Sequence, residues 1–324
     1  MKNLSYHLLY ALAYVLSLLP FAVLYVLADG CFLFLYYIIR YRRAIVRRNL
    51  SSSFPDKSEA ELRQTERRFY RWLCDYGVET LKLLTISDEA LLRRFEFHGA
   101  EQVERVFDEG RDCAAILGHY CNWEWLSATS LAFKGTRHTS GQSPEQPAPV
   151  MGLIYHPLYN EAFDRLFIDI RSAHHGTCIP KKDILRHLVT LKHEGRRSFF
   201  GYISDQVPKW ENMHLWLPFL NHDTPVFTGG ERIMRKMDNA VFYIGLKRPR
   251  RGYYTCTFEL ISEHAAQEPE NVITTRFFQR LEESIRQEPS YYLWTHNRWK
   301  RGREEFERKY DVIDGKIIRK EAYK

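Results

Sequence analysis

Apolar positions in the first forty residues form long runs rather than a periodic pattern. Residues 6–28 contain no Asp, Glu, Lys or Arg, and a second apolar stretch, residues 31–39, follows Asp29 and Gly30. A run of this length is long enough to enter or cross a bilayer. Arginines follow it directly, which favours a cytoplasmic location for the rest of the chain. We therefore expect a membrane anchor or hairpin over residues 1–40 and one domain over residues 41–324. A buried hairpin of a soluble domain is the alternative.

From Phe54 onward the pattern is that of a water-soluble domain. Ser58 and Glu61 have the spacing of a capping box, and apolar residues then recur at helical intervals. Capping residues, glycines and apolar spacing predict further helices over 100–109, from Pro157 to near Gly176, after Asp183, from Gly229, and from Ile273 to before Pro289.

Short apolar runs between these helices predict buried strands, at residues 114–117, 198–203, 241–246 and 253–260. Residues 210–219 are aromatic and are expected to form a loop. Strands that alternate with helices indicate an α/β layered domain.

Composition adds a chemical constraint to this picture. The chain has a net charge of +7 and a pI of about 9.0, which suits anionic partners such as a phospholipid surface or a phosphorylated substrate. We expect no nucleic-acid partner, because no binding motif accompanies the charge. The six cysteines include no Cys-x-x-Cys pair, so we expect reduced thiols, no metal site and no cofactor.

One predicted strand, residues 114–117, leads into a candidate for acid–base chemistry. Gly118 and His119 follow it, and Glu124 lies five residues after the histidine. A carboxylate on one ring nitrogen of a histidine helps the other nitrogen to accept a proton. With 13 His and 40 acidic residues, chance gives roughly 1.6 such spacings. His156 and Glu161 share the spacing, but no apolar strand precedes them.

Five blocks in order resemble the bacterial lipid A late acyltransferases, a branch of the lysophospholipid acyltransferase superfamily. The similarity extends from the membrane segment to about Arg301. The blocks are Arg42–Leu50 followed by Phe54-Pro55; Gly118–Glu124, with its His-x4-Glu motif; Tyr155-His156-Pro157 with Asn160 and Arg171; Asp205-Gln206 before Pro218-Phe219 and Thr228-Gly229; and Tyr292–Trp299.

The resemblance implies a layered αβα acyltransferase domain with a central mixed sheet, preceded by a membrane-associated helical segment. It implies transfer of a fatty acyl chain from acyl carrier protein or acyl-coenzyme A to a hydroxyl of a lipid A precursor. That reaction belongs to lipopolysaccharide biosynthesis on the cytoplasmic face of the inner membrane of Gram-negative bacteria. The phospholipid membrane and the glycolipid acceptor are then the expected partners.

The resemblance also assigns roles to residues. His119 is the expected general base and Glu124 its orienting carboxylate. Arg171, Asp205 and Gln206 fall at substrate-binding or oxyanion positions, with Asp205 holding Arg171 or another basic group. For His296 and Arg298, substrate positioning and structural packing are equally open.

Two other functions remain open at this stage. One is a thiol hydrolase that uses Cys121, although no signature of such enzymes surrounds it. The other is a membrane-associated lipid-binding or scaffold protein without catalysis, for which the apolar N-terminus and the basic stretches suffice. The basic turn at residues 247–251 is read as a solvated hairpin turn, with docking of an acidic carrier protein as its alternative.

Overall fold

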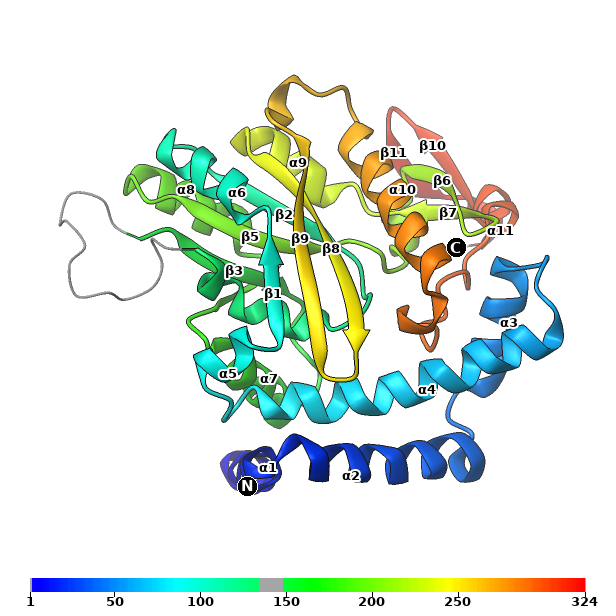
Figure 1. Ribbon diagram of the computed structural model, residues 1–324. Helices are drawn as coiled ribbons and strands as arrows, with labels where there is room; N and C mark the ends of the chain where they lie inside the picture. Colours follow the sequence, from blue (N-terminus) through cyan, green and yellow to red (C-terminus); the bar gives the residue numbers. More distant parts are fainter. Residues whose placement is uncertain (1, 134–147, 324) are drawn as a thin grey trace.

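A computed structural model of the protein describes residues 2–133 and 148–323 (Figure 1). Its centre is a seven-stranded sheet in the order β1-β9-β8-β2-β5-β3-β4. β8 and β9 pair antiparallel, and the other neighbours pair parallel. The expected mixed sheet is thus confirmed. The strands are β1 (Phe95–His98), β2 (Cys113–Leu117), β3 (Val150–Tyr155), β4 (Thr177–Pro180), β5 (Ser198–Ile203), β8 (Ala240–Arg250) and β9 (Tyr253–Ser262).

Helices cover both faces of this sheet, which confirms the layered arrangement. On one face, the 3-10 helix η2 (Trp123–Ala132) lies over Ala115 and Leu117 of β2. On the other face, α10 (Val272–Gln287) comes so close that a Cβ on Gly118 would lie 2.8 Å from the Leu281 side chain. Other helices that frame the sheet are α5 (Asp88–Leu92), α6 (Ala100–Asp108), α7 (Glu161–Ser172), α8 (Ile184–His193) and α9 (Gly229–Met237).

The N-terminal part of the chain is helical and packs on the domain. It comprises α1 (Lys2–Leu18), α2 (Phe21–Leu33), the π-helix η1 (Phe34–Ile39) and α3 (Arg43–Ser53). α2 lies along the long helix α4 (Glu59–Lys82), whose predicted capping box is present (Figure 1). Within the described residues, Phe21–Ile39 is long and apolar enough to cross a membrane, with a mean hydropathy of 2.0. The domain boundary at residue 40 stays a prediction.

Two predicted segments differ in the structure. α7 begins at Glu161 rather than at Pro157, because the Asn160 side chain caps its first amides. Residues 210–219, expected to be a loop, contain the 3-10 turn η4 (Trp210–Asn212) and β6 (Leu215–Phe219), which pairs with β7 (His222–Val226). Two strand prolines, Pro218 and Pro225, obscured this two-stranded ribbon, since proline is unusual within strands.

The C-terminal region adds elements for which no prediction was made. It contains η5 (Ala265–Gln267), η6 (Pro289–Tyr291), α11 (Arg303–Lys309), β10 (Tyr310–Ile313), β11 (Lys316–Arg319) and η7 (Glu321–Tyr323). Phe306 and Tyr310 stack with Trp210, so this region rests on the residues before the β6–β7 ribbon.

The basic turn between β8 and β9 is neither a fully solvated turn nor an open basic patch. Arg248 is buried and pairs with Asp75 of α4 at 2.6 Å. Arg251 pairs with Asp75 as well, and with Asp29 of α2 at 2.9 Å. Two of the five residues of the turn therefore bind the N-terminal helices to the sheet.

Candidate active site

The candidate site lies where two neighbouring parallel strands end. His119 follows β2 and Asp205 follows β5, and Leu117 is in register with Ile203. The amide of Ser204 donates to the carbonyl of Leu117, which continues the ladder to the sheet edge. Residues after adjacent parallel strands meet at this edge, where open α/β sheets place their ligands. The fold therefore brings together residues that are 86 positions apart in the sequence.

His119 and Asp205 form a direct pair. The Nδ1 atom of His119 lies 2.6 Å from Oδ1 of Asp205, and the His119 amide donates to Oδ2 at 3.0 Å. Burial alone would raise the pKa of the Asp205 carboxyl. The charge of His119, its two hydrogen bonds and the more distant Arg298 outweigh burial and hold that pKa below its usual value. Asp205 is thus an ionised, buried acceptor that fixes the imidazole.

This pairing also decides the tautomer of the neutral imidazole. An ionised carboxylate can only accept, so Nδ1 of His119 carries the proton and donates it to Asp205. Nε2 then has a free lone pair, and the Gln206 amide group lies 3.2 Å from it, in position to donate. Gln206 is exposed, and the His119 side chain retains 16% of its accessible surface. Nε2 is therefore a basic nitrogen that a hydroxyl can reach by displacing Gln206.

Glu124 has a different partner from the one expected. Arg171 binds its carboxylate through Nε at 2.8 Å and Nη2 at 2.7 Å, and the Tyr76 hydroxyl donates at 3.3 Å. The predicted contact between Glu124 and His119 is replaced by two separate pairs, His119–Asp205 and Glu124–Arg171. The reason is the chain path: η2 begins between the two motif residues and directs Glu124 toward α7, while the end of β5 delivers Asp205 to His119.

The turn between His119 and Glu124 is held by the rest of the fold. Its left-handed residue is Cys121, with φ of 54°, rather than Gly118. The amide of Cys121 donates to Tyr291 at 2.8 Å, and the carbonyl of His119 accepts from Leu293 at 3.2 Å. A β-bridge also joins Tyr120 to Tyr292. The C-terminal block thus fixes the backbone on which the histidine sits.

A buried carboxylate holds the other end of this turn. Asn122 caps η2 with its side-chain oxygen and donates from Nδ2 to Glu79 at 2.8 Å. Glu79 also accepts from Tyr254 of β9 and from Tyr25 of α2. Burial raises the pKa of Glu79, as expected for a carboxyl in the core. The N-terminal helices and the site loop are therefore linked through one side chain.

His296 and Arg298 lie close enough to Asp205 to interact with its charge, and their hydrogen bonds are to the backbone. Nε2 of His296 accepts from the amide of Val207, and burial lowers the pKa of this histidine to about 4. Arg298 is buried, donates to the carbonyl of Pro225, and has its pKa lowered by desolvation. Arg298 adds positive charge near Asp205. Neutral His296 fixes the loop that follows Asp205 through its hydrogen bond with Val207.

Two alternatives lose support from the geometry. Cys121 is buried, and desolvation raises the pKa of its thiol well above the usual value, so it lacks the exposed thiolate that a nucleophile needs. His156 is exposed, and its Nδ1 lies 3.0 Å from the carbonyl of the adjacent Pro157. Within residues 2–133 and 148–323, no three or more His, Cys, Asp or Glu side chains gather as metal ligands.

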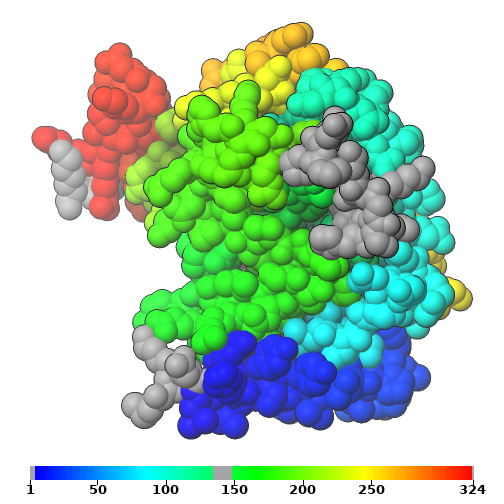
Figure 2. Space-filling view, turned by 90° about the vertical axis from the view of Figure 1, so that its left-hand side faces the viewer, coloured from blue at the N-terminus to red at the C-terminus, as the bar shows by residue number. Residues whose placement is uncertain are grey.

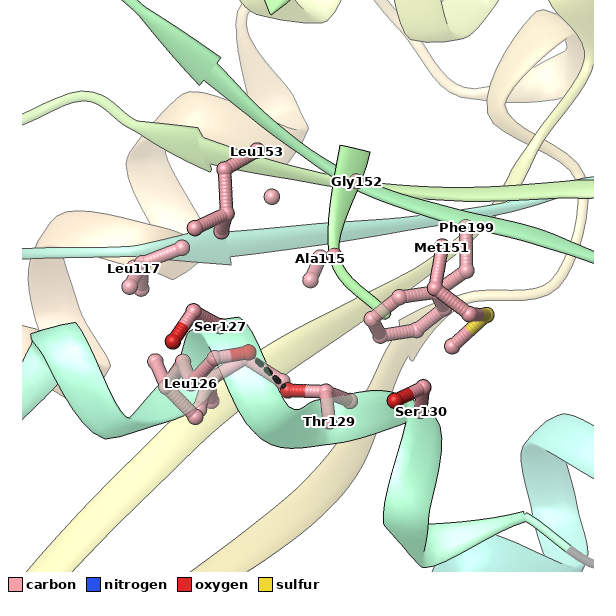
Figure 3. Close-up of a pocket in the computed structure, with 13 residues that line it drawn as sticks. Ala115, Leu117, Leu126, Ser127, Thr129, Ser130, Met151, Gly152, Leu153 and Phe199 are labelled. Atoms are coloured by element: carbon pink, nitrogen blue, oxygen red, sulfur yellow. Dashed lines mark hydrogen bonds between the residues drawn. The ribbon is translucent and has the colours of Figure 1, made fainter. Parts of the chain in front are cut away.

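A narrow apolar cavity lies between η2 and the face of β2, β3 and β5 (Figure 3). Leu117 lies two residues before His119, and Leu126 lies two residues after Glu124. Figure 3 shows Leu117, Leu153 and Phe199 on the sheet side facing Leu126 and Thr129 of η2. A long apolar substrate group fits such a space better than a polar one.

A histidine–carboxylate pair where two parallel strands end, an apolar cavity against the same sheet and apolar N-terminal helices are features that suit an enzyme acting on lipids. Residues 2–301 match the family described as bacterial lipid A biosynthesis acyltransferase, and the chain belongs to that family. It is similar to the lipid A biosynthesis acyltransferase of Haemophilus influenzae (strain ATCC 51907 / DSM 11121 / KW20 / Rd), with 24% identity over 263 residues, 80% of this chain and 78% of the relative. The resemblance seen in the sequence is confirmed, and membership supports an acyltransferase role in lipid A synthesis.

Proposed function

We propose that the protein transfers a fatty acyl chain from an acyl thioester to a hydroxyl of a lipid A precursor. The donor is an acyl carrier protein or acyl-coenzyme A, and the reaction takes place on the cytoplasmic face of the inner membrane. The observation that carries the proposal is the geometry around His119: Asp205 on Nδ1 and an accessible lone pair on Nε2. A general base needs this tautomer.

The proposed reaction follows from this geometry. The acceptor hydroxyl displaces Gln206 and gives its proton to Nε2 of His119 as its oxygen attacks the thioester carbonyl carbon. The tetrahedral intermediate then collapses, the carbon–sulfur bond breaks, and the imidazolium returns the proton to the leaving sulfur. Asp205 stabilises the imidazolium between these steps. No metal or cofactor takes part in the proposed steps.

Glu124 and Arg171 act in this proposal as a second unit. Arg171 uses Nε and Nη2 for Glu124, so three of its five N–H bonds remain for a substrate oxygen. Burial alone would lower the pKa of Arg171. The hydrogen bonds and charge of Glu124 outweigh burial and raise this pKa above its usual value, so the guanidinium stays charged. A fixed cation suits either a phosphate of the acceptor or the oxyanion of the intermediate. Glu124 supports catalysis by holding Arg171.

The apolar cavity beside the site supports the acyl part of the proposal. Its walls are side chains of β2, β3, β5 and η2, and its lining exposes far more apolar than polar surface. An acyl chain gains about 0.8 kcal/mol for each methylene that leaves water. In the proposal the acyl chain extends from the thioester at His119 toward this apolar space, which has to widen to hold it.

The test is acyl transfer by purified variants, with acyl carrier protein carrying a labelled fatty acid and a lipid A precursor as acceptor. His119→Ala should lower the initial rate at least ~10²-fold, the low end for general-base catalysis. His156→Ala is the matched control and should have little effect, because His156 is exposed and its Nδ1 lies against the carbonyl of Pro157 rather than a carboxylate. Near-normal rates for folded His119→Ala contradict the proposal. An absence of transfer by the wild-type protein, with intact lipid binding, favours a non-catalytic lipid-binding protein.

A further inference from the structure

Hydropathy alone does not show how the N-terminal helices of this protein lie relative to a membrane. We infer that α1, α2 with η1, and the start of α7 lie flat in one leaflet of an anionic phospholipid bilayer, and that none of the helices within residues 2–133 and 148–323 crosses it. This inference deepens the membrane association included in the proposed function. Four observations carry it: how α2 is docked, how α1 is tied, which side chains face outward, and where the exposed arginines lie.

α2 is docked along its length on a charged helix. Four residues at intervals of four bury one face of α2 and η1 against the domain: Leu24, Ala28, Phe32 and Tyr36. Arg71 of α4 lies 5.1 Å from the Phe32 ring centroid. α4 also exposes Arg63, Arg67 and Arg68. If α2 crossed the bilayer in this position, α4 would carry its arginines into hydrocarbon, at a cost of several kcal/mol for each charge.

Polar contacts hold α2 in that position near its centre. The hydroxyl of Tyr25 donates to buried Glu79 at 2.9 Å, and Asp29 pairs with Arg251. Asp29 lies near the middle of the apolar segment Phe21–Ile39. In a spanning helix this carboxylate would lie near the bilayer centre. In the docked helix it has a partner at the protein surface instead.

α1 is tied at both ends to the same side of the domain. Its apolar segment, Leu4–Leu18, is shorter than the ~20 residues that a spanning helix needs. Near its start, Tyr6 donates to Asp169 of α7. At its end, Lys82 and Thr85 donate to the carbonyl of Ser17. Both ends of α1 therefore lie at one surface of the protein.

The outward faces of these elements form one apolar surface. Figure 2 shows α1 and α2 along the lower edge of the molecule, with α7 directly above, and α1 packs against α7. Tyr159, just before α7, is fully exposed, and Leu158 and Phe163 are 46% exposed. The exposed apolar residues of the N-terminal helices are Leu4, Leu8, Leu12, Tyr14, Val15, Leu18, Val23, Val26, Leu27, Leu33, Phe34, Tyr37, Ile38 and Ile39. Soluble monomers rarely expose so many contiguous apolar side chains.

Exposed arginines lie at the end of this surface. Arg40 and Arg42 follow η1 directly, and both are exposed. Both have left-handed backbone conformations, with φ of 56° and 51°, where the chain turns from η1 into α3. Cations beside an in-plane apolar face are attracted to anionic head groups, at about 1 kcal/mol each. The occupant of the surface is thus one leaflet of an anionic membrane.

Depth measurements on the full-length protein test this inference. Single spin labels are placed at Val23, Leu33, Ile38 and Tyr159 after Cys31→Ser and Cys178→Ser, and the protein is added to anionic phospholipid vesicles. All four labels should lie at similar shallow depths, about 5–10 Å below the head groups. A label at the exposed residue Val189 on α8 is the control and should stay in water.

Two outcomes would overturn the inference. A deep label at Leu33 between shallow labels at Val23 and Ile38 identifies a spanning helix. Water exposure of all four labels, in protein that still transfers acyl chains, means that this surface does not meet the membrane while the proposed activity stands. A loss of transfer with all labels inserted instead counts against the proposed function alone.

A second measurement tests the contact made by α7. The double variant Leu158→Ser and Tyr159→Ser should weaken vesicle binding by about tenfold, since two apolar side chains no longer leave water. Val189→Ser is the matched control and should bind like wild type. If the double variant and the control bind vesicles equally well, the start of α7 does not contact the membrane.

Discussion

Two carboxylates near His119 have different electrostatic tasks, and this difference is testable. Asp205 accepts from Nδ1 of His119, whereas Glu124 is engaged by Arg171. Asp205→Asn should lower the rate at least ~10²-fold, because an amide can stabilise the wrong tautomer. It should also move the acid limb of the pH–rate profile to lower pH, since the imidazolium loses its counter-charge.

Glu124→Gln provides the contrasting result. It should lower the rate by freeing Arg171, yet leave the acid limb in place. Glu124→Asp should keep more activity than Glu124→Gln, because the charge is retained and only reach is lost. The measurement is the initial rate of acyl transfer over pH 5–8 for folded variants. If the acid limb shifts in Glu124→Gln and stays in place in Asp205→Asn, then Glu124 rather than Asp205 orients the His119 imidazole.

His296 should make stability depend on pH. Burial lowers the pKa of His296 to about 4 in the folded state, against about 6.5 in the unfolded chain. Between these values the unfolded state binds more protons, so stability falls as pH falls from 6.5 toward 4. Between pH 7 and pH 5 the loss should be about 1–2 kcal/mol.

The matched variant for this effect is His296→Gln, whose side chain still accepts from the Val207 amide without titrating. The urea midpoint in detergent should fall less between pH 7 and pH 5 for this variant than for wild type. His222, whose pKa burial also lowers, contributes to both proteins alike. Parallel midpoints at the two pH values would show that His296 is not the titrating group.

Among elements, the contact between α2 and α4 combines apolar packing with buried polar groups. Tyr25→Phe removes the donor to Glu79 and keeps the ring. Because the acceptor is a buried carboxylate, the free energy of unfolding should fall by about 1.5–3 kcal/mol. Hydrogen exchange of the α2 amides should accelerate as well.

Tyr14→Phe is the control for this change, since Tyr14 lies on the exposed side of α1. Its exchange rates and unfolding free energy should match those of wild type. If Tyr25→Phe behaves like the control, the hydroxyl contributes nothing to docking, and packing alone holds α2.

Helices and strands could be predicted from the sequence more fully than the contacts between the side chains that follow them. The strands before His119 and Asp205 are continuous apolar runs, and the capping box at Ser58 is a local signal, so both were found. The His119–Asp205 pair was missed because strand order, rather than spacing, creates it. Glu124 was assigned to His119 because they are close in sequence, although η2 turns it away.

The C-terminal hairpin was a missed local signal. Asp314-Gly315 lies between two short segments that each contain a pair of β-branched apolar residues, and both turn residues have positive φ, as a two-residue hairpin turn requires. The β6–β7 ribbon had no such signal, since its prolines argue against strands. The β10–β11 hairpin can thus be predicted from its local sequence, whereas the β6–β7 ribbon depends on pairing that only the fold supplies.

At the scale of the whole molecule, the N-terminal helices cover part of the domain and, in the proposed arrangement, also anchor it to the membrane. Deletion of residues 1–40 should release the protein from membranes, because most of the apolar surface is lost. It should also expose the side of α4 that packs on α2, so aggregation is expected. Sedimentation with membranes and light scattering measure the two effects. A truncated protein that sediments wholly with intact membranes and remains active would contradict the role of residues 1–40 as the main anchor.

The attachment of the site loop to the C-terminal block has a consequence for biosynthesis. The carbonyl of His119 accepts from Leu293, and Tyr120 bridges to Tyr292. A nascent chain can therefore place α1 and α2 on the leaflet while the ribosome is still translating, but it cannot close the loop until about residue 293 has emerged. With the proposed membrane contact and the proposed activity, attachment then precedes the competence to transfer acyl chains. Unfinished chains should therefore be inactive, and the newly completed site should form beside the bilayer that holds the proposed acceptor.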